Sequence, residues 1–280
     1  MSDMFRLDGK VAVVIGGAGG IGEIMAKGMA AQGAKVAIAS RNLKKITEIA
    51  NSIKTETKSE VAGFSVDVVD KASVDKLAAD VVSKFGTVDI LVNSQGINTK
   101  KPADNFPIED WDQLFNVNVR GTMLACSAFG KTMIGKKSGK IINVSSVRGL
   151  RATLWGGNEG YSATKGAVDM MTRALASEWA PHNINVNAIA PGVVDGEHWD
   201  GVDAFFAKYE NRPRGEKKRI VGESVGPGTK GASEADDDVE PFFDNLTIDP
   251  GELDQQEAQD ATHDQFPNTL DPEVYHPPAV

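Results

Sequence analysis

A tyrosine and a lysine four residues apart are the side chains of this sequence best suited to acid–base chemistry. Tyr161 and Lys165 stand in the run Tyr-Ser-Ala-Thr-Lys, inside a helical pattern over about 161–180. Residues four apart lie on one face of a helix, which brings the ammonium near the phenol. A phenol is a poor base at neutral pH, and a neighbouring positive charge favours its phenolate form. We therefore expect Tyr161 to exchange a proton with a substrate oxygen.

A glycine-rich loop near the N-terminus is a second chemical signal. The run 16–22, GGAGGIG, follows an apolar stretch at 11–15 and opens a helical pattern over 21–32. Glycines between a strand and a helix let the backbone approach a pyrophosphate, and the helix N-terminus offers N–H groups and the positive end of a dipole. This context predicts a dinucleotide site, whereas a glycine run outside it would be a flexible turn.

These residues depend on a framework of strands and helices for their positions. Six short apolar runs alternate with longer helical patterns, which predicts one domain with a doubly wound parallel sheet, an α/β fold of the Rossmann type. The expected strands are 11–15, 35–39, 63–66, 88–92, 140–144 and 184–190, and the expected helices are 21–32, 43–57, 72–85, about 109–132 and about 161–180. Such sheets bind ligands beyond the carboxyl ends of their strands, where the polar residues singled out here lie.

Seven motifs at these strand ends and helices follow one another along the chain. They are the glycine loop with Gly16, Gly20 and Gly22, then Asp67-Val68, Asn93 with Gly96, Asn118, Ser146 with Gly149, Tyr161 with Lys165, and Pro191-Gly192. With these motifs the sequence from about residue 7 to 192 resembles the short-chain dehydrogenase/reductase family. The resemblance implies an NAD(P)-dependent alcohol dehydrogenase or ketoreductase with Tyr161 as the general acid and base.

The resemblance also implies a role for each matching residue. The catalytic set would be Asn118, Ser146, Tyr161 and Lys165. Lys165 would hydrogen-bond the nicotinamide ribose, Ser146 the substrate oxygen, and Asn118 a water that links the lysine to solvent. The cofactor contacts would be Gly16, Gly20, Ile21, Gly22, Ser40, Arg41, Asp67, Val68, Asn93, Gly96, Tyr161, Lys165, Pro191 and Gly192.

From the residues alone, each polar member of the catalytic set has a structural reading as well. Tyr161 could be an aromatic residue at a helix start, and Lys165 a solvated charge. Ser146 could satisfy backbone groups in a turn, and Asn118 could pack between helices with its amide satisfied. Both readings stay open for these residues at the level of sequence.

The end of the second expected strand favours NADP over NAD. Sites that prefer NAD place an acidic residue there for the ribose 2′-hydroxyl, and an arginine accommodates a 2′-phosphate. Ser40 occupies the position of the acid, and Arg41 follows it. A guanidinium binds phosphate through two hydrogen bonds. We expect NADP, with NAD possible, and the alternative is that Arg41 is a surface charge.

Two segments bear on the substrate. The loop 150–160 separates Ser146 from Tyr161 by a spacing longer than usual in the family, and the segment 193–221 is expected to form a substrate lid. The residues expected to contact the substrate are Trp155, Glu197, His198 and Trp199. Trp155 could equally be an exposed aromatic residue, and the three residues of the lid could cap a helix. His198 lacks metal-ligating neighbours at suitable spacing, so no metal site is expected.

Different parts of the chain resemble different members of the family. Residues 7–192 look most similar to gluconate 5-dehydrogenases, and residues 193–221 resemble bacterial dehydrogenases of polyols such as sorbitol and galactitol. These resemblances imply hydride transfer between NADP(H) and a secondary alcohol or ketone of a polyol or sugar acid. One alternative is reduction of a 3-oxoacyl thioester, which uses the same catalytic motifs. Others are a cofactor-binding protein without turnover and a module whose acidic tail binds a basic partner.

The composition narrows the class of protein. The chain has 280 residues, of which 41% are hydrophobic and 25% charged. Its single cysteine, Cys126, excludes an internal disulfide, and the start at 1–6 has no signal-peptide pattern. The apolar runs are shorter than a membrane span. We expect a cytoplasmic protein with a small-molecule substrate and no membrane or nucleic-acid partner, since the basic run 214–219 is typical of a solvated helix face.

The last 59 residues differ from the rest in charge. Residues 222–280 hold 15 acidic residues and one lysine, against 24 acidic and 29 basic residues before them. Low hydrophobicity with high like charge predicts a disordered acidic tail, so the expected catalytic domain is 1–221. The last helix and seventh strand usual in the family are not recognisable in 222–280. We expect an unpaired sheet edge there, which makes the family's usual homo-oligomer doubtful.

Overall fold

A computed structural model of the chain describes residues 3–151, 157–192, 194, 207 and 213–215. All of them belong to the first of two units into which the chain divides, Met1–Ser233; the second is Glu234–Val280. The acidic segment 222–280 and most of the expected lid lie outside the described residues. The same holds for the four expected substrate contacts, Trp155, Glu197, His198 and Trp199. The domain boundary and these four contacts therefore stay predictions.

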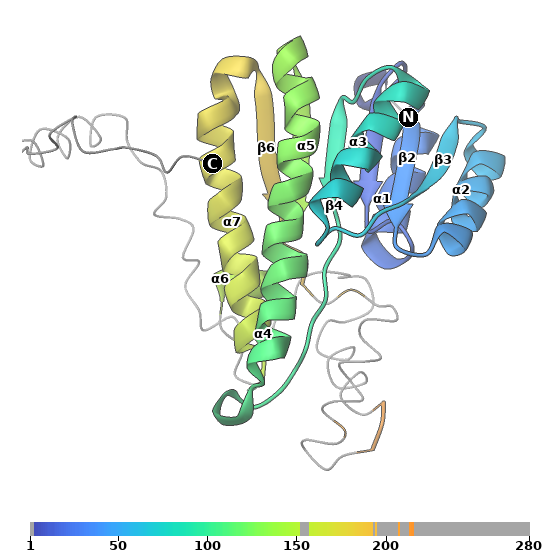
Figure 1. Cartoon of the computed structure of the whole chain (residues 1–280). Coiled ribbons are helices and arrows are strands. Elements are labelled where there is room, and N and C mark those ends of the chain that lie inside the picture. Colours follow the sequence, from blue (N-terminus) through green and yellow to red (C-terminus); the bar gives the residue numbers. More distant parts are fainter. Residues whose placement is uncertain (1–2, 152–156, 193, 195–206, 208–212, 216–280) are drawn as a thin grey trace, which may run out of the picture. The chain divides into compact units, whose positions relative to one another are not determined.

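Six parallel strands form one sheet in the order β3-β2-β1-β4-β5-β6 (Figure 1). The strands are β1 (Val11–Ile15), β2 (Lys35–Ser40), β3 (Val61–Ser65), β4 (Ile90–Asn93), β5 (Gly139–Val144) and β6 (Ile184–Ile189). Val13 of the central strand pairs with Ala37 on one side and Leu91 on the other. The order of the strands reverses between β1 and β4, which is where doubly wound sheets bind their ligands. The predicted fold class is confirmed.

Helices cover both faces of this sheet. They are α1 (Gly20–Ala31), α2 (Leu43–Thr57), α3 (Lys71–Phe85), α4 (Ile108–Phe115), α5 (Gly121–Lys136), α6 (Val147–Leu150) and α7 (Glu159–Trp179). Short 3-10 turns occupy Asp3–Phe5, Ala103–Asn105 and Ala180–His182, and a π-helical turn, Asn116–Arg120, joins α4 to α5. None of the helices within the described ranges combines the length and apolar character needed to cross a lipid bilayer.

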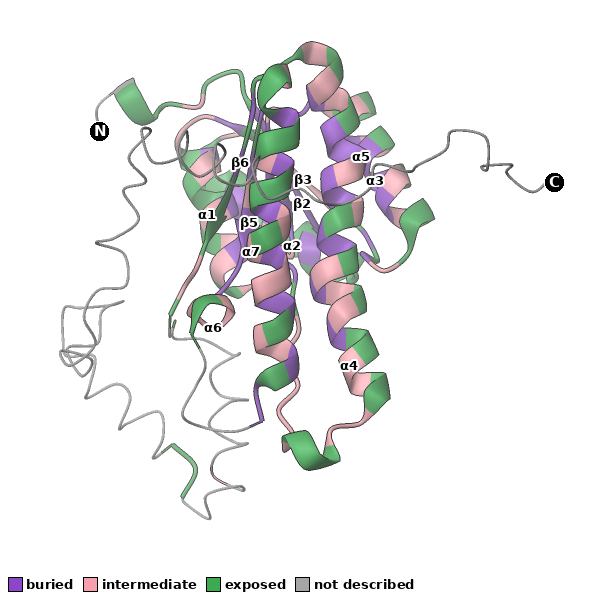
Figure 2. Cartoon of the chain, turned by 90° about the vertical axis from the view of Figure 1, so that its left-hand side faces the viewer, coloured by how far each residue is buried: buried purple, intermediate pink, exposed green. Residues whose placement is uncertain are grey.

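Alternate residues of the strands supply two separate cores. Val13 and Leu91 point to the face covered by α3, α5 and α7, where they join a buried cluster that includes Phe129. Ala12 and Val14 point to the other face and pack with α1 and α2. Buried residues therefore follow the strands and the inner sides of the helices (Figure 2). β1 is buried on both faces, which explains its continuous apolar sequence.

The sheet has an open edge at β6 within the part of the chain that the structure describes. The order of strands ends at β6, and no described residue pairs with its outer side. Its last three residues, Asn187, Ala188 and Ile189, are exposed. An unpaired strand presents free backbone N–H and C=O groups. Because residues 222–280 lie outside the described ones, the unpaired edge expected from the sequence stays a prediction for the whole chain.

A chain of buried side-chain hydrogen bonds ties the two central strands to the helices above them. Asn93 of β4 donates through Nδ2 to Asn143 Oδ1 of β5 at 2.9 Å and to the Sγ of Cys126 on α5 at 3.3 Å. Asn143 Nδ2 in turn donates to Thr172 Oγ1 on α7 at 2.9 Å. The Asn93 amide thus points into this network, and Asn93 is not among the residues that line the cavity described below; its expected contact with the cofactor stays a prediction. The four side chains hold α5 and α7 in place beneath the strand ends.

Replacing Asn143 by leucine should lower the free energy of unfolding by about 2–3 kcal/mol, because buried partners on Asn93 and Thr172 would lose their hydrogen bonds. The shift would be measured as a lower urea midpoint at an unchanged slope. Asn187→Ala, at an exposed position on the adjacent strand β6, is the matched control and should change the stability by less than about 0.5 kcal/mol. Equal effects of the two substitutions would contradict a stabilising role for the network.

Candidate active site

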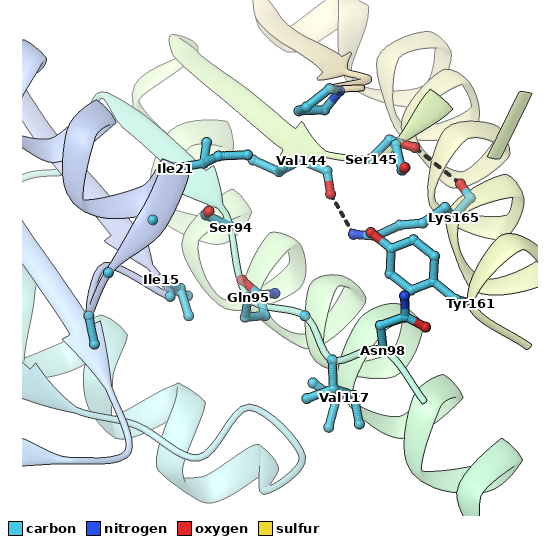
Figure 3. Close-up of a pocket in the computed structure, with 18 of the residues that line it drawn as sticks. Ile15, Ile21, Ser94, Gln95, Asn98, Val117, Val144, Ser145, Tyr161 and Lys165 are labelled. Atoms are coloured by element: carbon cyan, nitrogen blue, oxygen red, sulfur yellow. Dashed lines mark hydrogen bonds between the residues drawn. The ribbon is translucent and has the colours of Figure 1, made fainter. Parts of the chain in front are cut away.

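A cavity of about 970 Å³ runs along the carboxyl ends of the strands (Figure 3). It starts at the glycine loop after β1, passes the loops that follow β4 and β5, and reaches Tyr161 and Lys165 on α7. The predicted site residues that line it are Gly16, Gly20, Ile21, Arg41, Asp67, Val68, Gly96, Ser146, Tyr161, Lys165, Pro191 and Gly192. Motifs far apart in the sequence thus meet in one space.

The glycine loop is shaped for close approach of a ligand to the backbone. Gly16 has a φ of +84°, and a Cβ at this position would lie 2.6 Å from the backbone nitrogen of Gln95. A Cβ at Gly22 would collide with the carbonyl oxygen of Gly16, so Gly22 lies behind the lining and lets the loop fold over the start of α1. Backbone N–H groups and a helix N-terminus facing a cavity of this size fit the pyrophosphate of a dinucleotide.

Two cations line the cavity at the end of β2. Arg41 follows the strand directly, and Lys45 lies in the first turn of α2. The turn between them is ordered by Asn42, whose Oδ1 accepts from the backbone N–H of Lys45 at 3.0 Å. Ser40 is not among the residues that line the cavity, and it donates to the carbonyl oxygen of Asn42 at 3.4 Å; its expected contact with the cofactor stays a prediction. The strand end therefore offers positive charge where an NAD-preferring site offers a carboxylate.

Lys165 is a buried cation held by the end of β5. Its side chain is 4% exposed, and Nζ donates to the carbonyl oxygen of Val144 at 2.7 Å (Figure 3). Burial lowers the pKa of Lys165 from 10.5 to about 8, and the carboxylate of Asp169 opposes this change. An ammonium has three N–H donors, so the bond to Val144 leaves two for groups in the cavity.

The Tyr161 phenol differs from the expectation. Burial raises its pKa above 10, while a hydrogen bond with Ser146 acts in the opposite direction. Lys165 Nζ lies 5.6 Å from the centre of the ring and is directed at Val144. The predicted lowering of the pKa of Tyr161 by the neighbouring ammonium is therefore not found, since burial is the larger effect. At neutral pH the phenol carries its proton and is ready to donate it.

The two adjacent serines after β5 have separate tasks. Ser145 Oγ donates to the backbone oxygen of Lys165 at 3.4 Å and so contacts α7. Ser146 lines the cavity, hydrogen-bonds Tyr161 and accepts from the N–H of Arg148 at 3.2 Å. Ser146 thus satisfies a backbone group in a turn and also faces the cavity, while its expected bond to the substrate oxygen stays a prediction. Gly149 explains the Ser-x-x-Gly spacing, since a Cβ there would lie 2.8 Å from the backbone carbon of Lys165.

Asn118 positions the loop after β4. It is fully buried in the π-helical turn. Its Oδ1 accepts from the N–H of Ile97, and its Nδ2 donates to the carbonyl oxygen of Ile97, both at 2.9 Å. Nδ2 also donates to Thr164 Oγ1 at 3.0 Å. The amide is satisfied and lies behind the cavity lining, so the side chain acts as a clamp between this loop and α7, and its predicted link through water stays untested.

Sequence reasoning missed several residues of the cavity. Those with polar side chains include Lys45, Gln95, Asn98, Lys100, Gln113 and Asn158. Asn98 follows Gly96 by two residues, and Asn158 precedes Tyr161 by three, so proximity to known motifs was the available signal. The described residues include no cluster of three or more His, Cys, Asp or Glu side chains able to hold a metal ion.

Known proteins identify the family. The sequence model described as short chain dehydrogenase matches residues 10–204. The chain belongs to the short-chain dehydrogenase family. It is 46% identical over 230 residues to sorbitol dehydrogenase of Cereibacter sphaeroides, with 82% of this chain and 88% of the relative covered. It is 41% identical over 225 residues to galactitol 2-dehydrogenase of Agrobacterium fabrum, with 79% and 84% covered.

Solved structures share this fold. NAD+-bound xylitol dehydrogenase is similar with a TM-score of 0.70 and 30% identity, over 72% of this chain and 78% of that one. A gluconate 5-dehydrogenase from Burkholderia cenocepacia, in complex with NADP and tartrate, has a TM-score of 0.68 and 35% identity, over 74% and 81%. The protein is therefore an oxidoreductase, and its fold is shared with one enzyme solved with NAD+ and with another solved with NADP.

Lys165→Met should stabilise the folded protein at neutral pH, because it removes a buried charge. Lys165 loses its proton near pH 8 in the folded protein, whereas it loses this proton near pH 10.5 in the unfolded chain. The unfolded chain thus binds more protons between these values, and wild-type stability rises with pH across them. Below pH 8 the variant should be more stable by up to about 3 kcal/mol, and this gain should shrink as the pH rises to 10.5.

Thermal unfolding between pH 6 and 10.5 checks this expectation. Lys44→Met, on the exposed surface of α2, is the control and should leave the pH dependence of stability unchanged. A Lys165→Met protein that is less stable than wild type at pH 7 would mean that the bond to Val144 outweighs the burial of the charge.

Proposed function

We propose that this dehydrogenase transfers a hydride between NADP(H) and a secondary alcohol or ketone of a polyol or sugar acid. The observation that carries the proposal is the single cavity in which the glycine loop, Arg41 and the Ser146–Tyr161–Lys165 set meet. Relatives named for sorbitol, galactitol and D-threitol support the substrate class. A gluconate 5-dehydrogenase with a similar fold supports sugar acids.

The residues of the cavity divide the chemistry between them. When bound, NADP(H) supplies the acceptor or donor of the hydride. In reduction, Tyr161 gives its phenolic proton to the substrate oxygen, and Ser146 holds that oxygen. In oxidation, the Tyr161 oxygen takes the hydroxyl proton, which requires the phenolate; the hydrogen bond from Ser146 favours this form. The two N–H groups of Lys165 that do not bind Val144 remain available to donate to a ribose hydroxyl of the cofactor.

The preference for NADP rests on the charges at the end of β2. Arg41 and Lys45 both line the cavity there and are exposed. A phosphate between two such cations forms charge-assisted hydrogen bonds, whereas a ribose hydroxyl gains little from them. Acidic residues of the lining, Glu23 and Asp67, come from other elements, in the first turn of α1 and after β3. The 2′-phosphate of NADP can therefore bind Arg41 and Lys45, and NAD, which lacks this phosphate, cannot make the same contact.

A substrate panel tests the reaction. Wild-type protein should oxidise sorbitol, galactitol, xylitol or gluconate with NADP, because the cavity can hold an open chain next to Tyr161. Tyr161→Phe should lose activity by about a thousandfold or more, since removal of the acid and base costs at least the general acid–base contribution, while NADPH binding stays within about twofold of wild type. The measurements are initial rates and fluorescence titration with NADPH.

The panel also contains acetoacetyl thioesters. A higher kcat/KM for a thioester than for every polyol and sugar acid would replace the proposal by a thioester reductase. Tight NADPH binding without turnover of any substrate would replace it by a cofactor-binding protein. Activity retained in Tyr161→Phe would exclude Tyr161 as the proton donor.

Arg41→Ala should raise the KM for NADP by about tenfold and the KM for NAD by less than about threefold, because the lost contact is worth roughly one charge-assisted hydrogen bond. Steady-state kinetics with both cofactors measure the difference. Lys44→Ala, in the first turn of α2 three residues beyond Arg41 and outside the cavity lining, is the matched control and should change neither value. A parallel increase of both KM values in Arg41→Ala would contradict the role in binding the 2′-phosphate.

A further inference from the structure

Two asparagines meet in the cavity on the side of Tyr161. Asn98 lies in the loop after β4, and Asn158 directly precedes α7. Asn98 Nδ2 donates to Asn158 Oδ1 at 3.4 Å, and Asn158 Nδ2 donates to Ser162 Oγ at 3.4 Å. Figure 3 labels Asn98 next to Tyr161 in the lining. The two amides thus come from different elements and line the cavity near the proton donor.

The Asn98 amide has an acceptor that the described residues leave unused. Its Oδ1 is buried and accepts no hydrogen bond from any of them. The orientation of the amide follows from its Nδ2, which donates to the Oδ1 of Asn158, so the free atom is the oxygen. A buried polar atom without a partner costs free energy. Such an atom in the lining of a cavity indicates that a ligand supplies the missing donor.

Another amide in the lining has a free oxygen in a different part of the cavity. Gln95 Oε1 is also buried without a partner among the described residues. Gln95 lies against Gly16 of the glycine loop, and its Nε2 donates to Thr122 Oγ1 at 3.2 Å. It therefore belongs to the part of the cavity shaped for the dinucleotide. Asn98 is left as the free acceptor on the side of Tyr161.

The pair is held in place by its surroundings. Asn118 binds both backbone groups of Ile97, which fixes the residue just before Asn98. Asn158 is 4% exposed, and its carbonyl oxygen accepts from the N–H of Ser162 at 2.9 Å, in the first turn of α7. A binding group on such a support loses little freedom when a ligand arrives.

We propose that Asn98 and Asn158 form a subsite that binds a second hydroxyl group of the substrate, on a carbon other than the one that reacts. The subsite rests on the proposed function, because a second hydroxyl is what distinguishes a polyol from a simple alcohol. The hydroxyl donates to Asn98 Oδ1, and its oxygen remains free to accept from an amide N–H. A carboxylate has no proton to donate at neutral pH, so this subsite favours a hydroxyl-bearing end over an acidic end.

Two substitutions at Asn98 distinguish the loss of the acceptor oxygen from a change in side-chain volume. Asn98→Leu removes the oxygen and keeps a similar volume, whereas Asn98→Asp keeps an acceptor oxygen. With the best polyol among sorbitol, galactitol and xylitol, we expect Asn98→Leu to lose about tenfold or more in kcat/KM, which is the value of one hydrogen bond. Asn98→Asp should keep more than a third of the wild-type value.

The matched control is Asn51→Ala, which removes an exposed asparagine from α2 outside the cavity and should behave as wild type. All variants should bind NADPH with unchanged affinity, which a general disturbance of the loop would alter. A loss within twofold in Asn98→Leu, or equal losses in Asn98→Leu and Asn98→Asp, would overturn the subsite while leaving the proposed function in place. Wild-type protein that reacts with thioesters and with no polyol would instead overturn the proposed function, and the subsite with it.

Discussion

The burial of one ammonium group constrains the whole site. Lys165 is held between α7 and the end of β5 by its bond to the carbonyl oxygen of Val144. A cation removed from water costs free energy unless polar groups surround it. The carbonyl oxygen of Val144 and the carboxylate of Asp169 supply such groups. The close approach of α6 to α7 at Gly149, where a larger residue would not fit, and the bond from Ser145 to the backbone of Lys165 keep the lysine in this place. The position of the Lys165 ammonium in the cavity therefore depends on how α6, α7 and the end of β5 pack together.

Asparagine amides connect this site to the rest of the sheet. Asn93 and Asn143 join the central strands to α5 and α7, while Asn118 joins the loop after β4 to α7. Asn143 and Asn118 each donate and accept at once, so one side chain can fix two elements in a single relative position. The cavity keeps its shape because strands, loop and helices are tied by these bonds in addition to apolar packing.

Much of this architecture could be predicted from the sequence. All six strands and the order of the motifs follow from apolar runs and strand-end residues, and the helix expected at 43–57 has those bounds in the structure. The expected strand at 63–66 instead begins at Val61 and ends at Ser65, because pairing with β2 decides its limits. Local patterns carry such information when one face of an element is uniformly apolar.

Other features depend on tertiary contacts and could not be predicted. The Asn93 side chain points into the core rather than the cavity because Asn143, fifty residues away, offers it a partner. The meeting of Asn98 with Asn158 arises only when two distant loops converge. The proton affinity of Tyr161 depends on how deeply α7 buries it, which no spacing along the chain records.

The π-helical turn between α4 and α5 has a mechanical consequence. The turn Asn116–Arg120 carries one residue more than a regular α-helical turn needs. Each residue of an α-helix advances the next by roughly 100°. Deleting a single residue there would let α4 and α5 merge into one continuous helix, and Asn118 would rotate away from Ile97. The irregular turn thus rotates α5 about the helix axis relative to α4, so that the two consecutive helices direct different faces toward the rest of the molecule.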